Sequence, residues 1–253
     1  IRSLDVLQAL QAPRPQAPGG LDKEEAVISA LTPLRKRIAE NVVKSAFTAP
    51  HVTLVMEVDA GALSRARARL LPEVERDFGC RLSFTDLLVR GAAAALVEHR
   101  AVNSALIGDK IYTYKRINIG VAVALDDGLV APVIHDADGK PVGEISRELK
   151  ELASRARAGR SLPDDFAGGT FTITNLGALE IDSFDPVIVP PQAAILGVGR
   201  IAEKPVARNG KLEIGTMMKL CLSFDHRVLD GYPAARFLQR LKQLLEDPEP
   251  WLR

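Results

Sequence analysis

The sequence predicts an α/β or α+β fold in which helices flank a mixed β-sheet. Short apolar runs typical of β-strands alternate irregularly with amphipathic helical patterns, and no internal repeat is visible. The chain has 253 residues, of which 47% are hydrophobic and 26% are charged, an ordinary globular composition. This length is enough to bury a substantial core in one large domain.

The first part of the sequence lacks the pattern of a folded domain. Residues 1–10 carry leucines at helical spacing but are too few to fold alone. Residues 11–25 contain prolines between small or polar residues, which is typical of an extended interdomain linker. We therefore expect the folded domain to span residues 26–253. Because the chain begins with Ile1, we also expect it to be part of a longer polypeptide.

Helices are predicted from start and stop signals and from apolar residues at helical spacing. Thr32 and Pro33 form a helix start, and Pro50 ends this helix. We expect it to bury an apolar stripe made of Leu34, Ile38, Val42 and Ala46. Further helices are predicted over residues 63–78, 83–100, 144–158 and 233–245.

Strands are predicted where β-branched and apolar residues form short runs between turn residues. The predicted strands are residues 52–58, 117–125, 129–134, 170–174, 193–198 and 217–224. Residues 197–202 (GVGRIA) superficially fit a dinucleotide-binding loop. However, Pro205, Asn209 and Gly210 are incompatible with the helix that should follow such a loop and bind pyrophosphate at its N-terminus. The motifs of a nucleophile elbow and of a P-loop are also absent from the sequence.

Charge and cysteine content restrict the partners. The sequence has 33 basic and 32 acidic residues, so its net charge of +1 gives no reason to expect nucleic acid or an anionic membrane. No apolar run approaches the roughly 20 residues of a membrane span. Cys80 and Cys221 lie far apart, without a C-x-x-C pair or a nearby histidine. We expect two buried thiols and no metal site.

His226 is the best candidate for a catalytic base among the four histidines. It follows the predicted strand 217–224 and precedes a polar loop that ends at Gly231, where a rigid sheet edge presents side chains. Asp230, four residues later, could orient the loop or tune the imidazole. Structural or solvated roles are assigned to the other three: His51, His99 and His135.

A second polar strand end lies in the predicted strand 170–174. The alternation of a strand places Thr170, Thr172 and Thr174 on one face. An ordinary threonine ladder would give the same pattern. Thr174 and Asn175 nevertheless end the strand just before Gly177, so polar groups again lie where a strand stops.

Four motifs, in this order, resemble the catalytic domain of the dihydrolipoamide acyltransferases, the core subunits of the 2-oxo acid dehydrogenase complexes. They are LRKRIA (34–39) with PHVT (50–53), GTFTITNLG (169–177), PPQAAILGVG (190–199) and LSFDHRVLDG (222–231). The resemblance covers about residues 28–253. Residues 1–10 resemble the last turns of the peripheral-subunit-binding domain that precedes the core in this family, and residues 11–25 resemble its linker.

This resemblance implies a fold like that of chloramphenicol acetyltransferase and a homotrimer whose active sites are shared between subunits. His226 would take the proton from a thiol, and Thr174 of the adjacent subunit would donate a hydrogen bond to the oxyanion. Asp230 would hold the histidine loop through a salt bridge, which we assign to an arginine within residues 35–37. The residues implied for coenzyme A are Arg67, Ser83, Asn175, Gly199 and Ile201.

The implied reaction is the transfer of an acyl group between a dihydrolipoyl thiol and coenzyme A. The lipoyl group would be carried on a separate lipoyl domain, absent from this chain. The trimers would assemble into a cubic 24-mer or a 60-mer core with decarboxylase and dihydrolipoamide dehydrogenase components. The implied location is the bacterial cytoplasm or the mitochondrial matrix. Two alternatives stay open: a stand-alone coenzyme A-dependent O- or N-acyltransferase, and a non-catalytic scaffold.

Overall fold

The computed structural model describes residue 27 and residues 29–252, and it divides into the units Ile1–Thr32 and Pro33–Arg253. The described residues of the first unit form no helix or strand. The predictions for residues 1–10 and 11–25 lie outside the described residues. All that follows concerns the second unit.

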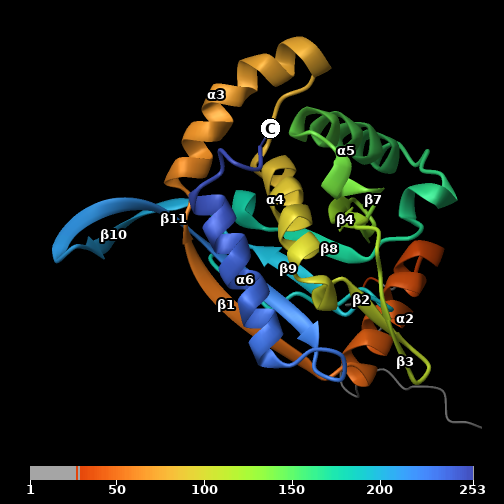
Figure 1. The fold of residues 1–253 in the computed structure, drawn as a ribbon. Coiled ribbons are helices and arrows are strands. Elements are labelled where there is room, and N and C mark those ends of the chain that lie inside the picture. The colour runs from red at the N-terminus through yellow and green to blue at the C-terminus, as the bar shows by residue number, and fades with distance from the viewer. Residues whose placement is uncertain (1–26, 28, 253) are drawn as a thin grey trace, which may run out of the picture. The chain divides into compact units, whose positions relative to one another are not determined.

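A mixed sheet forms the centre of this unit (Figure 1). Its strands run in the order β1 (His51–Asp59), β11 (Lys211–Asp225), β9 (Ala194–Val198), β8 (Phe171–Asn175), β4 (Ile119–Val121) and β7 (Val133–Ile134). A seventh strand, β10 (Ala202–Arg208), pairs with the first part of β11. β8 is parallel to β4 and β9, whereas the remaining pairs are antiparallel. The predicted mixed sheet is confirmed.

Helices cover the sheet and enclose the core. The five helices of this unit are α2 (Pro33–Thr48), α3 (Gly61–Phe78), α4 (Phe84–Glu98), α5 (Val142–Arg157) and α6 (Gly231–Glu246). Figure 1 shows α4 and α6 side by side in front of the strands. The alanine-rich α4 is buried along most of its length between α5 and α6. Small side chains allow this close approach on several sides of one helix.

Local signals explain where the helices that flank the site begin and end. α3 ends at Gly79, which takes the left-handed conformation with φ of 64° that glycine adopts without strain. α4 begins with a capping box, in which Ser83 accepts from the Asp86 amide and the Asp86 carboxylate accepts from the Ser83 amide. These caps fix the segment between α3 and α4.

The predicted helices and most predicted strands are confirmed, with shifts of a few residues. The predicted strands 117–125 and 129–134 are each broken in two, because β5 (Val123–Leu125) and β6 (Gly128–Val130) leave the sheet as a separate hairpin. Two elements were not predicted: β10 and the small hairpin of β2 (Ser104–Ile107) with β3 (Lys110–Thr113).

The predicted burial of the apolar stripe on α2 is wrong for the single chain. Leu34 and Ile38 are only half-buried, and Val42 is 44% exposed. The one buried residue of α2 is Ser45. Two further apolar side chains of this helix, Val43 and Phe47, are 55% and 85% exposed. Few elements of the same unit lie against these side chains.

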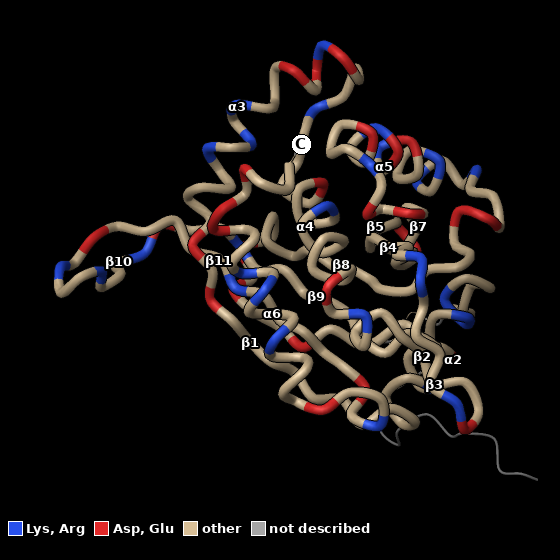
Figure 2. Tube along the Cα trace, viewed as in Figure 1, with Lys and Arg blue, Asp and Glu red and all other residues tan. Residues whose placement is uncertain are grey.

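Charged residues of both signs are mixed over the described elements, and both cysteines are free thiols. Figure 2 shows Lys and Arg interspersed with Asp and Glu over the described elements. Cys221 is buried and Cys80 is half-buried, both as free thiols, and burial raises the pKa of the Cys221 thiol. Within the described residues, no helix has the length and apolarity to cross a membrane. The same part of the chain holds no cluster of three side chains suited to a metal ion.

Candidate active site

His226 follows directly on the last residue of β11. Its main-chain N–H donates to the carbonyl of Pro50 at 2.9 Å, so the turn is anchored to the residue that precedes β1. The side chain is 45% exposed, and its ring lies 5.7 Å from the ring of the buried Phe224. A histidine in this position has a fixed backbone and an imidazole open to a substrate.

An ion pair inside the histidine motif holds the turn. The Arg227 guanidinium binds the Asp225 carboxylate in a fork, with Nε–Oδ1 at 3.0 Å and Nη2–Oδ2 at 2.7 Å. Asp225 is only 4% exposed, and its carboxylate raises the pKa of Arg227 above the usual range. The carbonyl of Asp225 also accepts from the amides of Val228 and Leu229. This pair was not predicted from the sequence, although both charges flank His226.

Asp230 contributes less to the turn than predicted. Its carboxylate lies 4.0 Å from His226 Nδ1, which is too long for a hydrogen bond, and its side chain is 87% exposed. Contacts between exposed charges at this distance are weak. A salt bridge between Asp230 and an arginine within residues 35–37 stays a prediction. The pair that holds the loop is Asp225–Arg227.

Thr174 lies near the end of the central strand β8. The three threonines are all buried, but they differ in their hydrogen bonds. Thr170 Oγ1 accepts from the Asn118 amide, and Thr172 Oγ1 donates to Gln192 Oε1 at 2.7 Å. Within the described part of the chain, the structure gives the Thr174 hydroxyl no such partner. Of the three hydroxyls, that of Thr174 is the one left to donate to a ligand.

Thr174 and His226 do not meet within one chain. Thr174 lies opposite Gly197 on β9, and Gly197 lies opposite Cys221 on β11. His226 lies five residues beyond Cys221, which at about 3.3 Å per strand residue is a separation of about 16 Å along the strands. The two candidate catalytic side chains therefore lie at opposite ends of the sheet.

Three of the residues predicted for coenzyme A gather at the start of α4. Arg67 Nε donates to the carbonyl of Leu82 at 3.0 Å, and its guanidinium lies 5.0 Å from the centre of the Phe84 ring. Ser83 caps the helix. Asn175 Nδ2 donates to Thr85 Oγ1 at 3.1 Å. A cation, a helix N-terminus and an amide thus surround one short segment, a combination that suits an anionic ligand.

Gly199 lies beside Asn175, and Ile201 follows two residues later. Asn175 pairs with Val198, so Gly199 follows immediately on the neighbouring strand. A Cβ atom on Gly199 would lie 2.0 Å from the carbonyl oxygen of Asp182, so only glycine fits there. Ile201 is half-buried against the core. The structure gives both a packing role, and their contact with coenzyme A stays a prediction.

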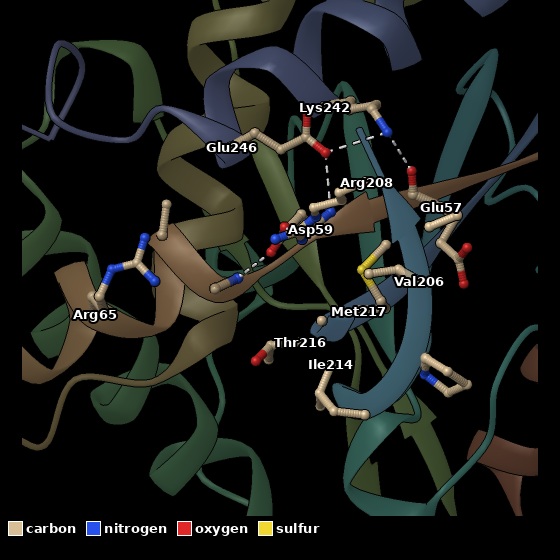
Figure 3. A pocket seen from close by; sticks show the side chains of 15 residues that line it. Glu57, Asp59, Arg65, Val206, Arg208, Ile214, Thr216, Met217, Lys242 and Glu246 are labelled. Carbon is tan, nitrogen blue, oxygen red and sulfur yellow. Dashed lines mark hydrogen bonds and ion pairs between the residues drawn. The ribbon is translucent and has the colours of Figure 1, made fainter. Parts of the chain in front are cut away.

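A hollow of about 790 Å³ lies at the base of the β10–β11 hairpin and contains none of the predicted site residues. Most of its charged side chains take part in ion pairs (Figure 3). Lys242 pairs with Glu246 and donates to the Glu57 carbonyl, and Asp59 binds Arg208. Arg65 also lines the hollow.

Comparison with known proteins places this geometry in a family. The family described as 2-oxoacid dehydrogenases acyltransferase (catalytic domain) matches residues 23–253. The lipoamide acyltransferase component of the branched-chain alpha-keto acid dehydrogenase complex of Bacillus subtilis is 42% identical over 89% of this chain and 52% of its own length. The dihydrolipoyllysine-residue acetyltransferase component of the acetoin cleaving system of the same organism is 35% identical over 96% of this chain and 61% of its own length.

A solved structure agrees with these matches. It is that of the dihydrolipoamide acetyltransferase of Azotobacter vinelandii, from an investigation of the roles of a serine, a histidine and an asparagine in catalysis. Its TM-score is 0.87 at 34% identity, covering 95% of this chain and all of the other. The chain spans 49% to 61% of the length of the first curated relatives that it matches. The chain belongs to the 2-oxoacid dehydrogenase acyltransferase family, and its match is to the catalytic domain.

Proposed function

We propose that this protein transfers an acyl group between the thiol of a dihydrolipoyl group and coenzyme A. His226 serves as the general base, and Thr174 of a second subunit stabilises the oxyanion. The observation that carries this proposal is the spacing of three residues. The serine, histidine and asparagine investigated in the Azotobacter vinelandii enzyme are 52 and 4 positions apart. Thr174, His226 and Asp230 have the same two separations.

Two of these three residue types differ between the proteins. Threonine in place of serine keeps a hydroxyl donor, so Thr174 retains the chemistry that an oxyanion needs. Aspartate in place of asparagine adds a negative charge 4.0 Å from His226 Nδ1. The Asp230 side chain is 87% exposed, so its electrostatic effect on the site is weak.

The proposed reaction needs only the attacking thiol, the thioester and the side chains of His226 and Thr174. Nε2 of His226 takes the proton from the attacking thiol, whose reference pKa of about 8.5 leaves little thiolate at neutral pH. The sulfur then forms a bond to the thioester carbonyl carbon, and the carbonyl oxygen becomes an oxyanion. The Thr174 hydroxyl donates to that oxygen. Collapse breaks the original carbon–sulfur bond, and the leaving thiolate takes the proton back from the imidazolium.

Coenzyme A is proposed to bind at the start of α4. Arg67 and the capped helix N-terminus would meet its charged part, and Asn175 would face the chain that leads to the thiol. Gly199 and Ile201 would border this path. The lipoyl group would arrive on a separate domain, as the dihydrolipoyllysine name of the relatives suggests.

A homotrimer is proposed because one chain cannot bring Thr174 and His226 together. Neighbouring subunits could place the Thr174 end of one sheet against the His226 end of the next. The exposed apolar side chains of α2 would then find a partner surface. Assembly of trimers into a cubic or larger core with decarboxylase and dihydrolipoamide dehydrogenase components, in the bacterial cytoplasm or the mitochondrial matrix, completes the proposal.

The test is an acyl-transfer assay with acetyl-, branched-chain acyl- and succinyl-CoA, using free dihydrolipoamide as acceptor. Formation of acyl dihydrolipoamide, and its loss by several orders of magnitude in His226→Ala, is expected. Transfer to an alcohol or amine but not to the dithiol would favour a stand-alone O- or N-acyltransferase. A His226→Ala variant as active as the parent would exclude His226 as the base.

A further inference from the structure

His51 forms hydrogen bonds with two separate parts of the backbone. Its Nδ1 lies 2.7 Å from the carbonyl oxygen of Ala49, two residues earlier. Its Nε2 lies 3.1 Å from the amide nitrogen of Ile188, which is 137 positions away in the sequence. The ring therefore joins the start of β1 to the segment that leads into β9.

These partners determine the tautomer of the ring. The Ile188 amide can only donate, so Nε2 must accept, and the proton must lie on Nδ1 to reach the Ala49 carbonyl. His51 is thus a neutral imidazole with both nitrogens occupied. Neither nitrogen is left to transfer a proton to or from a substrate.

The contact with Ala49 encloses Pro50, and Pro50 is the residue that anchors His226. The ring of His51 closes a short loop back to residue 49, which fixes the orientation of the Pro50 peptide between them. The carbonyl of Pro50 accepts the main-chain N–H of His226 at 2.9 Å. An imidazole of one histidine thus holds the peptide that holds the other histidine.

A second set of contacts makes this arrangement rigid. Ser45 Oγ donates to the carbonyl of Ile188 at 2.6 Å, so both polar groups of the buried Ile188 backbone are bound by side chains. Five residues later, the carbonyl of Ala193 accepts from the Asp225 amide, next to His226. The Asp225 and His226 amides, at the start of the turn, are therefore bound by the two backbone segments that His51 joins.

We propose that His51 is a positioning residue for His226, which acts by fixing the Pro50 carbonyl that binds the His226 amide. This role rests on the proposed function of His226 as the base. Displacement of a catalytic group by about 1 Å can lower the rate about 100-fold, so a loosened Pro50 peptide should affect kcat. Substrate binding at the α4 end of the sheet should be unaffected.

Three substitutions separate the two hydrogen bonds of the ring. His51→Phe removes both while keeping a ring of similar size. His51→Asn keeps a donor near the Nδ1 position for Ala49, and His51→Gln keeps an acceptor near the Nε2 position for Ile188. A matched control is Thr53→Val, because Thr53 lies two residues further along β1 and its hydroxyl bonds Ser223 Oγ at 2.8 Å, away from Pro50.

Kinetics on the folded, assembled protein well below its Tm provide the first measurement. His51→Phe is expected to lower kcat by about 10- to 100-fold, with KM for coenzyme A and dihydrolipoamide within about twofold of the parent. His51→Asn should recover most of kcat, because it restores the turn around Pro50. Thr53→Val should keep the parental kcat even if its Tm falls.

Hydrogen exchange provides a measurement that does not depend on activity. The amide of His226 should exchange faster in His51→Phe than in the parent, whereas in Thr53→Val it should not. Either a parental kcat or parental His226 exchange in His51→Phe would overturn the positioning role. So would a His51→Asn variant as slow as His51→Phe. An inactive parent would overturn the proposed function of His226. The exchange measurement would then still test the positioning role, because it does not depend on activity.

Discussion

Thr174 and His226 lie at opposite ends of one sheet, about 16 Å apart along the strands. Thr174 is the last residue but one of β8, and His226 follows directly on β11. If neighbouring subunits complete each active site, mixtures of two inactive variants should show activity.

Two inactive variants should restore activity when they are assembled together. Thr174→Val is expected to lower kcat about 100- to 1,000-fold through loss of the oxyanion donor, and His226→Ala removes the base. In mixed trimers formed by refolding equal amounts, a site with Thr174 from one subunit and His226 from another is intact in roughly a quarter of cases. We therefore expect about a quarter of parental activity from the mixture.

The control for this experiment is the double variant Thr174→Val/His226→Ala mixed with parent. Intact sites then form only between two parental subunits, again in roughly a quarter of cases. If both residues of a site came from one subunit, the first mixture would stay inactive and the second would keep about half of the activity.

Arg67→Ala should weaken coenzyme A binding without slowing the chemical step. Loss of a charged contact to an anionic ligand is expected to raise KM for coenzyme A roughly tenfold and to leave kcat and KM for dihydrolipoamide nearly unchanged. Arg69→Ala is the matched control, because Arg69 binds Glu249 at the surface, at 2.7 Å. Equal effects of the two substitutions on KM would contradict the assignment of Arg67.

Strand patterns indicated His226 and Thr174 as candidate catalytic residues, but no pattern indicated the contacts around them. His226 follows an apolar strand, and Thr174 lies within an alternating one. The bond from His51 to Ile188 joins residues 137 positions apart, and no local pattern indicates such a contact. The Asp225–Arg227 pair was visible as two charges beside His226, but only the burial of Asp225 shows that they bind each other.

The same limit applies to the fold. Capping signals at Gly79 and Ser83 give the ends of α3 and α4 closely, because they are local. β10 was missed because Pro205 was used only to exclude a helix, although proline is tolerated in an edge strand. The apolar stripe of α2 was predicted correctly as a pattern. Its exposure in the described residues could not be predicted from the helical pattern alone.

Arg227→Ala should loosen the histidine turn and destabilise the protein. It leaves the buried carboxylate of Asp225 with one backbone donor, the amide of residue 227, which we expect to lower the free energy of unfolding by about 1–3 kcal/mol. Arg227→Lys keeps the charge but not the fork, so its cost should be smaller. Chemical denaturation measures both, and an Arg227→Ala variant of parental stability and kcat would contradict this role.

Asp165 should make stability depend on pH in the acid range. The hydrogen-bonded Arg155 guanidinium holds the pKa of this carboxyl below its usual range, and the Leu162 amide adds to the effect. Because the folded pKa is depressed, the stabilisation is fully present above the unfolded pKa of about 3.9 and is lost as the pH falls through the folded pKa.

The measurement is the free energy of unfolding of parent and Asp165→Asn against pH. The parent should be more stable at pH 7, and the difference should narrow as the pH drops below about 4. Asp164→Asn, at the exposed neighbouring position, should follow the parent at every pH. A difference between parent and Asp165→Asn that does not change with pH would show that the ion pair with Arg155 is not its source.

The exposed apolar side chains of α2 should be needed for assembly and not for folding of the chain. Val43 and Phe47 are 55% and 85% exposed, so replacing both with serine removes little that the single chain buries. The Tm of the dissociated chain should therefore change little, while sedimentation shows a shift from trimer to monomer. Activity should be lost in proportion to the monomer fraction, although Thr174 and His226 are both present.

Leu162→Ser, at another site that is 60% exposed, should leave both sedimentation and activity unchanged. A monomeric V43S/F47S variant that retains parental kcat would show that one chain suffices for catalysis, and the shared site would have to be abandoned.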